Sequence, residues 1–381
     1  MASLQQQHIA VIGAGAFGGW TALSLARAGA RVTLLDQRDP GNALSSSGGA
    51  SRVIRHVYER RHHVAMARRA LELWLEADQV WGQQLFHRKG VLFMSGQGDM
   101  LARAAEHMDQ LDVEYERLDG SELARRYPQM RCEGFDDAIF EPATGYLDAW
   151  RACTVVRDAF VREGGNYRQE RAEPGLMRNS ELQGLTMADG SPLDADQFVF
   201  ACGPWLPNLF PAALRGVLSV TRQSEFFFRT PREQMQALNH DLPVWAALGE
   251  SFWYGIPGAD GLFKLADDRH GAEVDPETQS REPGEAALEA ARAYMGHRFP
   301  GMRGAEYAGA RVCQYTVSRD EDFILDRVPG AENAWLMGAG SGHGFKHGPA
   351  MGELAAGCIL GASAPPAHFS LDRFVKAPGR T

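Results

Sequence analysis

The chain has 381 residues, of which 44% are hydrophobic and 23% are charged. This length exceeds the usual size of one compact core, so we expect a globular protein of two domains. Acidic residues outnumber basic ones, 48 against 39, which gives a formal net charge of -9. That balance argues against binding to nucleic acid or to an anionic membrane, because both need a basic surface.

The cysteines and the apolar runs indicate the compartment. The five cysteines show no CxxC or other metal-ligand spacing, so we expect reduced thiols, no metal centre and a cytoplasmic protein. The first apolar run, residues 9–12, is shorter than the roughly seven residues that a signal-peptide core needs. No stretch of the sequence approaches the roughly 20 apolar residues of a membrane-spanning helix.

Residues 8–36, HIAVIGAGAFGGWTALSLARAGARVTLLD, carry the strongest local motif. An apolar strand leads into a GxGxxG turn and a helical pattern, and a second strand ends in an acid. Gly13 suits the tight turn, Gly15 the approach of a pyrophosphate, and Gly18 the close packing of helix on strand. Asp36 ends the second strand, where a carboxylate can accept hydrogen bonds from ribose hydroxyls. The motif predicts a Rossmann-type dinucleotide-binding domain and by itself leaves FAD and NAD open.

The rest of the chain alternates between strand and helix patterns. They predict strands at 31–35, 90–94, 217–220, 225–228, 251–256 and 262–265, and helices at 64–81 and 285–299. The strands after residue 215 indicate a mixed sheet distinct from the nucleotide-binding domain. Two segments, 196–205 and 334–360, return to a strand followed by glycines. They indicate that the nucleotide-binding domain is built from separate parts of the chain.

Several motifs resemble one family when they are taken in order. They are GAGAFGGW, SRVIRHVYE, FVFACGPW, YGIP with GLFKLADD, CQYT, and DEDFILD with GSGHGFKHGP. Together they resemble the D-amino-acid-oxidase-type FAD-dependent oxidoreductase superfamily, and within it the monomeric sarcosine oxidase and N-methyltryptophan oxidase group. The resemblance implies an α/β fold (α+β overall) with a Rossmann-type FAD-binding domain and a substrate domain built on a large mixed β-sheet. It assigns residues 1–84, 146–215 and 313–381 to the first domain, and 85–145 and 216–312 to the second.

The resemblance also implies how FAD is held. Cys313, in CQYT, matches the cysteine that this group joins to the flavin 8α-methyl carbon through a thioether, so we expect covalent FAD. A small buried core thiol is the alternative for this residue. The resemblance places further residues around the flavin, with backbone of the C-terminal glycine loop against its pyrimidine end: Ser51, Arg52, Gly342, His343, Gly344 and Lys346.

The same resemblance assigns the catalytic residues. Lys264 matches the lysine near flavin N5 that accelerates the reaction with dioxygen. Arg55 and Lys346 match the pair that binds the substrate carboxylate, and Tyr254 and Tyr315 match pocket tyrosines. The implied activity is oxidation of a secondary amine or amino acid with a carboxylate, giving hydrogen peroxide and an imine that hydrolyses. We expect a monomer or weak oligomer.

Two positions depart from the group's pattern. Gly48 and Gly49 stand where sarcosine-type members carry a histidine, and Asp268, followed by His270, stands where they carry a pocket histidine. These departures predict an enlarged cavity beside Gly48 and a substrate bulkier than sarcosine, an N-alkyl or cyclic amino acid. They also predict that Asp268 contacts a second polar or cationic group of that substrate.

Three other functions remain open at this point. A dehydrogenase of the same fold would pass electrons to a quinone or carrier protein in place of dioxygen. An NAD(P)-dependent dehydrogenase would satisfy the GxGxxG motif but would be colourless. A flavin-binding protein without activity would leave Lys264, Arg55 and Lys346 without a shared purpose.

Overall fold

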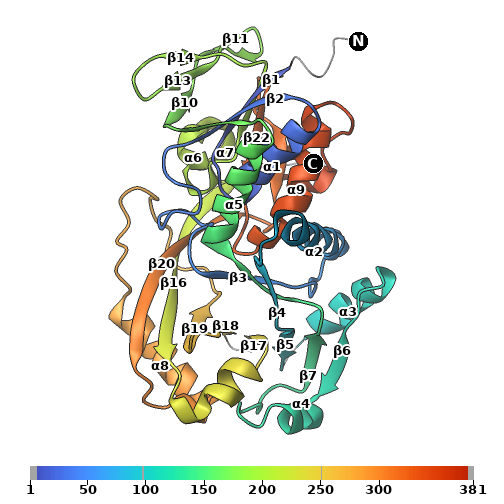
Figure 1. Cartoon of the computed structure of the whole chain (residues 1–381), viewed down its shortest axis with the longest axis vertical. Helices are drawn as coiled ribbons and strands as arrows, with labels where there is room; N and C mark the ends of the chain where they lie inside the picture. Colours follow the sequence, from blue (N-terminus) through green and yellow to red (C-terminus); the bar gives the residue numbers. More distant parts are fainter. Residues whose placement is uncertain (1–6, 97, 250, 376–381) are drawn as a thin grey trace, which may run out of the picture.

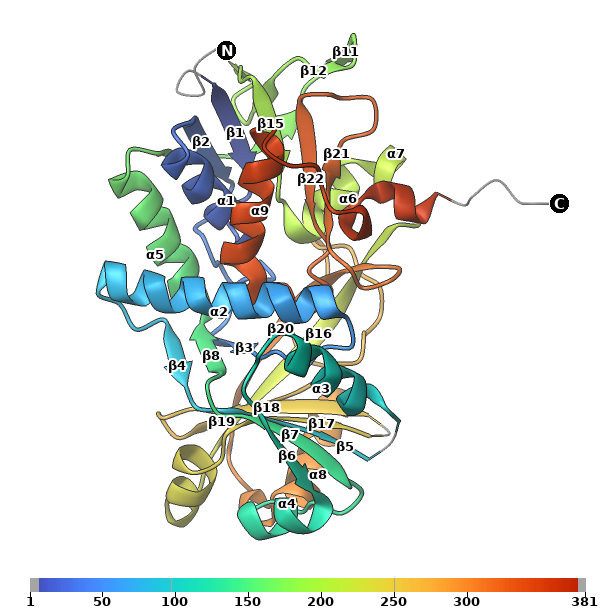
Figure 2. The same ribbon diagram turned by 90° about the vertical axis from the view of Figure 1, so that its right-hand side faces the viewer.

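Two large sheets lie at opposite ends of the computed structural model, and helix α2 (Arg61–Trp81) runs between them (Figures 1 and 2). The structure describes residues 7–96, 98–249 and 251–375. The helix predicted at 64–81 is therefore confirmed, with one more turn at its start. Its buried residues, including Val64, Leu71 and Trp74, recur at helical spacing and pack towards both halves of the molecule.

The first sheet has six strands and the topology of a nucleotide-binding domain. β1 pairs in parallel with β2 and β15, and β22 extends the parallel set beyond β15. The predicted strands at 9–12 and 31–35 are confirmed, and the segments at 196–205 and 334–360 do return to this sheet. In spatial order the strands are β21 (Ile324–Arg327), β22 (Ala334–Gly338), β15 (Gln197–Phe200), β1 (His8–Ile12), β2 (Arg31–Asp36) and β9 (Asn166–Gln169).

Helices cover one face of this sheet. α1 (Ala16–Arg27) lies between α9 (Gly348–Ile359) and α5 (Ala149–Arg162), and α9 in turn contacts α2 (Figure 2). Parallel strands buried on both faces need continuous apolar sequence, and β1 supplies it with Ile9, Ala10 and Val11, all fully buried. The short helices α6 (Leu206–Leu209) and α7 (Pro211–Leu214) follow β15.

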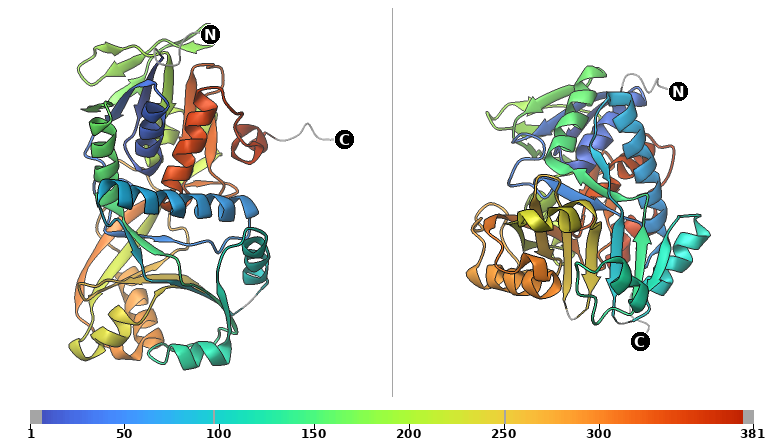
Figure 3. Two further views of the ribbon diagram at one scale, coloured as in Figure 1. Left: turned by 45° about the vertical axis from the view of Figure 1, so that its right-hand side comes forward. Right: turned by 60° about the horizontal axis from the view of Figure 1, so that its bottom comes forward.

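The second sheet has eight strands in mixed orientation. It curves beneath α2, with α4 (Gly120–Arg126) and α8 (Glu285–Arg298) on the side that faces away (Figure 3). α3 (Met100–Gln110) contacts α2, and its buried residues pack with those of α2 against the sheet. In spatial order the strands are β20 (Tyr307–Ser318), β16 (Leu218–Arg229), β19 (Leu262–Asp267), β18 (Phe252–Pro257), β17 (Val244–Leu248), β5 (Val91–Ser95), β7 (Asp137–Glu141) and β6 (Glu116–Asp119). The large mixed sheet predicted for the substrate domain is confirmed.

One detail of the predicted sheet is wrong. The runs at 217–220 and 225–228 are not two strands but one, β16, which pairs with β20 along nearly its whole length. The polar residues between the runs do not break the strand, because their backbone stays in the ladder. Arg222 pairs with Gln314, and Gln223 with Cys313. β16 and β20 thus reach from the second sheet towards the first (Figure 1).

Short sheets of two or three strands accompany the two large sheets. β3 (Ser51–Ile54), β8 (Gly145–Asp148) and β4 (Phe86–Arg88) form an antiparallel sheet beside α2. Two short antiparallel sheets lie beyond the six-stranded sheet. One consists of β10 (Ala172–Pro174), β13 (Leu185–Met187) and β14 (Pro192–Leu193), and the other of β11 (Met177–Arg178) and β12 (Glu181–Leu182). The division of the chain into two domains stays a prediction, and two of its boundaries, after 145 and after 312, fall inside β8 and β20.

Candidate functional site

A cleft with about 1300 Å³ of empty space opens at the carboxyl ends of the parallel strands. The residues that follow β1, β15 and β22 all line it, and this edge is where open α/β sheets bind their ligands. Seven glycines contribute to its walls: Gly13, Gly15, Gly203, Gly338, Gly340, Gly342 and Gly344. Glycine walls let a ligand approach the backbone closely.

The glycines of the N-terminal motif have separate positions in the turn between β1 and α1. Gly13 has a φ of 104°, in the left-handed region, and its N–H donates to the Leu35 carbonyl at 2.7 Å. Gly15 precedes the first turn of α1 and lines the cleft. A Cβ on Gly18 would stand 1.9 Å from the Gly13 carbonyl oxygen, so only glycine lets the helix lie against the turn.

Asp36 lies at the end of β2 and lines the same cleft. Its Oδ2 accepts the Ala14 N–H at 2.7 Å and its Oδ1 accepts the Arg38 N–H at 3.0 Å. Burial raises the pKa of this carboxyl group, and the two backbone N–H groups oppose that effect. Each oxygen keeps a second lone pair, with which it can accept a hydrogen bond from a ligand hydroxyl.

A second, smaller pocket adjoins the cleft at Arg52, Tyr315, Gly342 and Phe345, with about 630 Å³ of empty space. All six predicted catalytic residues line it, although they come from four separate parts of the chain. They are Arg55, Tyr254, Lys264, Asp268, Tyr315 and Lys346. The predicted cofactor residues Ser51, Arg52, Gly342 and His343 line it as well. The structure therefore brings the predicted substrate residues together beside the cleft.

Lys264, on β19, is 2% exposed and its ammonium group is paired. Nζ donates to Glu225 Oε1 at 2.8 Å and to the Ser51 carbonyl at 3.1 Å. Burial lowers the pKa of Lys264 to about 8, and the negative charge of Glu225 opposes that effect. The sequence had not indicated Glu225. The signal that was available is a carboxylate within an otherwise apolar run, Glu225-Phe226-Phe227-Phe228, because a buried acid requires a cationic partner.

Arg55 and Lys346 converge on one aromatic residue, Tyr58. The Arg55 guanidinium lies 4.2 Å from the centre of the Tyr58 ring, and Lys346 Nζ donates to the Tyr58 hydroxyl at 2.8 Å. Lys346 is 4% exposed. Burial, followed by the positive charge of Arg55, lowers the pKa of Lys346 well below its usual value. An anion bound between the two would favour the charged form of both, so this part of the pocket suits a carboxylate.

Asp268 is the negative group of the pocket. Its Oδ1 accepts a hydrogen bond from the Tyr315 hydroxyl at 2.9 Å. Burial raises the pKa of Asp268 to about 6, while the Tyr315 hydrogen bond and the positive charge of Arg55 oppose the rise. Burial also raises the pKa of Tyr315 and of Tyr254 well above 10, so both phenols stay neutral donors. One wall of the pocket is thus cationic and another carries a carboxylate.

Cys313 lies on β20 and is 2% exposed. Arg52 Nη2 lies 3.7 Å from its Sγ, which itself contacts the Ser46 carbonyl at 4.0 Å. Ser46 and Arg52 line the cleft, as does Tyr315 two residues further on, whereas Cys313 stands behind them. The thiol is therefore one layer from the cleft wall, beside a guanidinium group.

The C-terminal glycine loop connects the two cavities. Gly342 has a φ of 81°, and a Cβ there would meet the Tyr315 ring at 2.6 Å. His343 Nδ1 lies 3.4 Å from the Tyr58 hydroxyl, and the direction of this hydrogen bond depends on the histidine tautomer. Burial lowers the pKa of His343 well below 6.5. Gly344 lines the cleft. The predicted loop residues thus lie where the cleft meets the pocket.

The enlarged cavity predicted beside Gly48 is wrong. A Cβ on Gly48 would meet the Asn42 carbonyl oxygen at 2.3 Å and Arg311 Nη2 at 2.8 Å. A Cβ on Gly49 would likewise meet Arg311 Nη1, at 3.0 Å. The guanidinium of Arg311 fills the space that the missing side chain leaves, and it donates to the Ser45 carbonyl at 2.9 Å. The sequence had not indicated this arginine.

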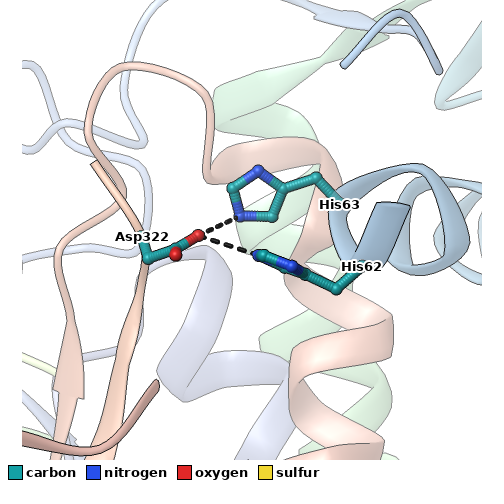
Figure 4. A group of neighbouring side chains, drawn as sticks. All are labelled: His62, His63 and Asp322. Carbon is teal, nitrogen blue, oxygen red and sulfur yellow. Dashed lines mark hydrogen bonds and ion pairs between the residues drawn. The ribbon is translucent and has the colours of Figure 1, made fainter. Parts of the chain in front are cut away.

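Outside the pocket, two histidines at the start of α2 meet one carboxylate (Figure 4). His62 Nε2 and His63 Nε2 lie 2.8 and 2.9 Å from Asp322 Oδ1, and these side chains are of types that bind metals. Arg60 donates to the other oxygen of Asp322. The carboxylate thus already has a cationic partner, and the cluster links α2 to the segment between β20 and β21.

A mostly parallel sheet with a glycine-lined cleft, next to a charged pocket, is an arrangement typical of dinucleotide-dependent oxidoreductases. None of the helices in the described ranges has the length and apolar character that a membrane crossing requires.

The chain is 30% identical over 363 residues to the monomeric sarcosine oxidase of Bacillus sp. (strain B-0618), covering 92% of each chain. It is 29% identical over 377 residues to the N-methyl-L-tryptophan oxidase of Salmonella heidelberg (strain SL476), covering 96% of this chain and 98% of that one.

The family assignment follows from a match along most of the chain. The model of the FAD dependent oxidoreductase family matches residues 8–357, and the chain belongs to that family. The crystal structure of L-proline dehydrogenase from P. horikoshii has the same fold, with a TM-score of 0.84, 20% identity, and coverage of 97% of this chain and 98% of that one. The family supplies what the GxGxxG motif left open: the cofactor is FAD, and the chain is an enzyme.

Proposed function

We propose that the enzyme is an oxidase of secondary amines or amino acids that carry a carboxylate, with dioxygen as electron acceptor. The observation that carries the proposal is the pocket in which Arg55, Lys346, Asp268 and Lys264 meet next to the cleft. The names of the relatives, oxidases of sarcosine and of N-methyl-L-tryptophan, support the same substrate class. Both names describe α-amino acids with a methylated nitrogen.

FAD suits the cleft for reasons visible in the chain itself. Gly13 and Gly15 leave the backbone bare where a pyrophosphate would meet the start of α1, and Asp36 stands where ribose hydroxyls would lie. When bound, FAD would supply the redox chemistry, a two-electron oxidation of the bond between the amine nitrogen and its neighbouring carbon, with dioxygen reduced to hydrogen peroxide as the final acceptor. The resulting imine hydrolyses in water.

The pocket residues bind and orient the substrate. Arg55 and Lys346 take the carboxylate, which fixes the position of the reacting C–H bond. The cationic side of the pocket disfavours the protonated amine, and hydride can leave only from the neutral amine. Asp268 faces the same space and can accept a proton or a hydrogen bond from a polar group of the substrate. Lys264 supplies positive charge to stabilise the negative charge that develops on dioxygen.

The substrate is identified by a screen for peroxide release. Purified enzyme is supplied in air with N-methyl amino acids, cyclic secondary amino acids and ordinary primary amino acids. We expect peroxide with members of the first two classes, and much slower peroxide release with the same amines after the carboxylate has been replaced by an amide. Turnover of primary amino acids alone contradicts the proposed substrate class.

We further propose that FAD is attached covalently through Cys313. The support is the position of the thiol beside Arg52, whose Nη2 lies 3.7 Å from Sγ. Joining sulfur to the flavin 8α-methyl carbon would break the S–H bond and one C–H bond. The two hydrogens would leave as protons, and the two electrons would pass to the flavin ring and from it to dioxygen, giving hydrogen peroxide. The flavin is expected to stay with the polypeptide after denaturation, as fluorescence on a denaturing gel. In Cys313→Ala it is expected to be released, while Cys153→Ala, which changes another buried cysteine, retains it. Release from the wild-type chain contradicts the linkage.

A dehydrogenase is the second candidate, and one observation favours it. The ammonium of Lys264 is paired with Glu225, so part of its charge is neutralised before dioxygen arrives. Such an enzyme would need a quinone or an artificial acceptor and would form little peroxide in air. The ratio of the two rates, with and without the acceptor, distinguishes the candidates.

A further inference from the structure

Glu225 is a buried carboxylate surrounded by three cations from three strands. It is 3% exposed, and Lys264 Nζ, Arg52 Nη1 and Arg311 Nη1 lie 2.8, 3.2 and 3.5 Å from its oxygens. Burial by itself would raise the pKa of Glu225, but the three cations hold it at about 2. Glu225 is therefore ionised at neutral pH.

Lys264 depends on that charge more than the arginines do. A guanidinium keeps its proton even when buried, whereas a buried ammonium readily loses one. Burial and the like charges of Arg52 and Arg311 all act to remove the proton from Lys264, and Glu225 is the group that acts to retain it. Tyr254 also faces Nζ, with the centre of its neutral phenol ring 5.9 Å away.

The contacts of Lys264 also fix where its last N–H points. An ammonium group has three N–H donors, and two are used by Glu225 and the Ser51 carbonyl. Both acceptors belong to hydrogen-bonded strands, β16 and β3. The third donor is left for the pocket that Lys264 lines.

We infer that Glu225 is a positioning residue that holds Lys264 protonated and directed into the pocket, where it serves the dioxygen step. This inference rests on the proposed oxidase function for its catalytic consequence, but the charge state of Lys264 can be measured without turnover. Glu225 lines neither of the two cavities, so it would act on the dioxygen step through Lys264.

The composition of the chain makes the measurement practical. It has four lysines among its 39 basic residues: Lys89, Lys264, Lys346 and Lys376. Lysine labelled at Cε with carbon-13 therefore gives four signals in the flavin-loaded enzyme. Lys264→Met identifies the signal of Lys264, and a pH titration of that signal gives its midpoint.

The decisive comparison is between Glu225→Gln and Glu225→Asp. Loss of an opposite charge in contact should lower the Lys264 midpoint by about 1–3 pH units in Glu225→Gln. Glu225→Asp keeps the charge and should restore most of the midpoint. The signal of Lys89, which lies outside the pocket, should titrate alike in every variant and serves as an internal control. A Lys264 midpoint that is unchanged in Glu225→Gln overturns the inference.

The kinetic consequence is measured on the reoxidation step alone. Substrate-reduced enzyme is mixed with dioxygen across a pH series, and the pH at which the rate declines should fall in Glu225→Gln in parallel with the midpoint. A faster reoxidation in Glu225→Gln would mean that Glu225 weakens the effect of the positive charge of Lys264 on dioxygen. That result also overturns the inference. If the midpoint moves as expected but Lys264→Met reoxidises normally, the proposed role of Lys264 fails instead.

A second variant covers the case in which Glu225→Gln does not fold. Arg311→Met removes a like charge near Lys264 and leaves Glu225 in place, so it should raise the Lys264 midpoint. Its flavin content and melting temperature report whether the loop that Arg311 holds is intact. A midpoint that does not rise in correctly folded Arg311→Met contradicts the charge coupling.

Discussion

The two adjoining cavities are lined by different kinds of chemical group. Glycines and backbone groups make much of the wall of the cleft, whereas charged and phenolic side chains make the functional part of the smaller pocket. The cleft needs its backbone in one conformation, so most changes there should act on folding and FAD binding together. The pocket depends on the charges of its side chains. Changes there should therefore alter single kinetic steps in an enzyme that still holds FAD.

The largest effect is expected at Gly18, which belongs to the cleft. In Gly18→Ala the new Cβ would stand 1.9 Å from the Gly13 carbonyl oxygen, so α1 must move away from the turn. We expect a loss of about 1–3 kcal/mol in the free energy of unfolding and loss of bound FAD. Flavin content and chemical denaturation measure both.

The matched control is the next residue of the same helix. A Cβ on Gly19 would meet its nearest atom, a Val156 methyl group, at 3.4 Å, which is ordinary contact. Gly19→Ala should keep FAD and gain stability, because alanine has the higher helix propensity. Equal damage from the two substitutions would mean that contact between α1 and the turn does not govern the cleft.

The second effect is expected at Lys264, in the pocket. Lys264→Met should slow reoxidation by dioxygen about 100- to 1000-fold, the usual loss when one electrostatic stabiliser of a developing negative charge is removed. Anaerobic reduction by substrate should change far less. Lys89→Met changes a lysine that does not line the pocket, so it should leave both rates unchanged. Equal slowing of reduction and reoxidation by Lys264→Met would refute a role specific to dioxygen.

A smaller effect is expected from the carboxylate pair. Arg55→Met and Lys346→Met should each lower kcat/KM about 10- to 100-fold, from the loss of a charged hydrogen bond. The two losses should not add, since both residues act on one anion and contact the same Tyr58. An N-methyl amine without a carboxylate is the control, because the variants should use it no worse than the wild type. Additive losses, or equal losses with that amine, contradict a shared anion site.

The remaining prediction is for stability, and it concerns pH and Asp268. The pKa of this carboxyl group is raised by burial to about 6, so the folded protein holds the proton more tightly than the unfolded chain does. The wild type should therefore lose stability, relative to Asp268→Asn, as pH rises from about 4 to 6, by about 1–3 kcal/mol in total. Denaturation of both proteins below and above this range gives the difference. A difference that grows in the opposite sense with pH shows that Asp268 is better stabilised as an anion.

The same contrast explains what the sequence predicts well. The first strand, the glycine turn, the helix and Asp36 are adjacent in the chain, so their spacing specifies the cleft directly. The pocket joins β3, β18, β19, β20 and the C-terminal loop, and its residues were predicted only through resemblance to a family. Glu225, Arg311 and Tyr58 were missed because their roles depend on contacts between distant strands. The prediction of a cavity beside Gly48 was wrong for the same reason, because the side chain of Arg311, on β20, occupies that space.

The most direct test of the oxidase proposal is one experiment on the flavin colour. The enzyme is mixed without air with an N-methyl amino acid that the peroxide screen has selected, and air is then admitted. We predict that the visible flavin absorbance bleaches in the first stage and returns in the second, with one hydrogen peroxide formed for each amine consumed. Bleaching that persists in air until a quinone is added would contradict the oxidase and support the dehydrogenase.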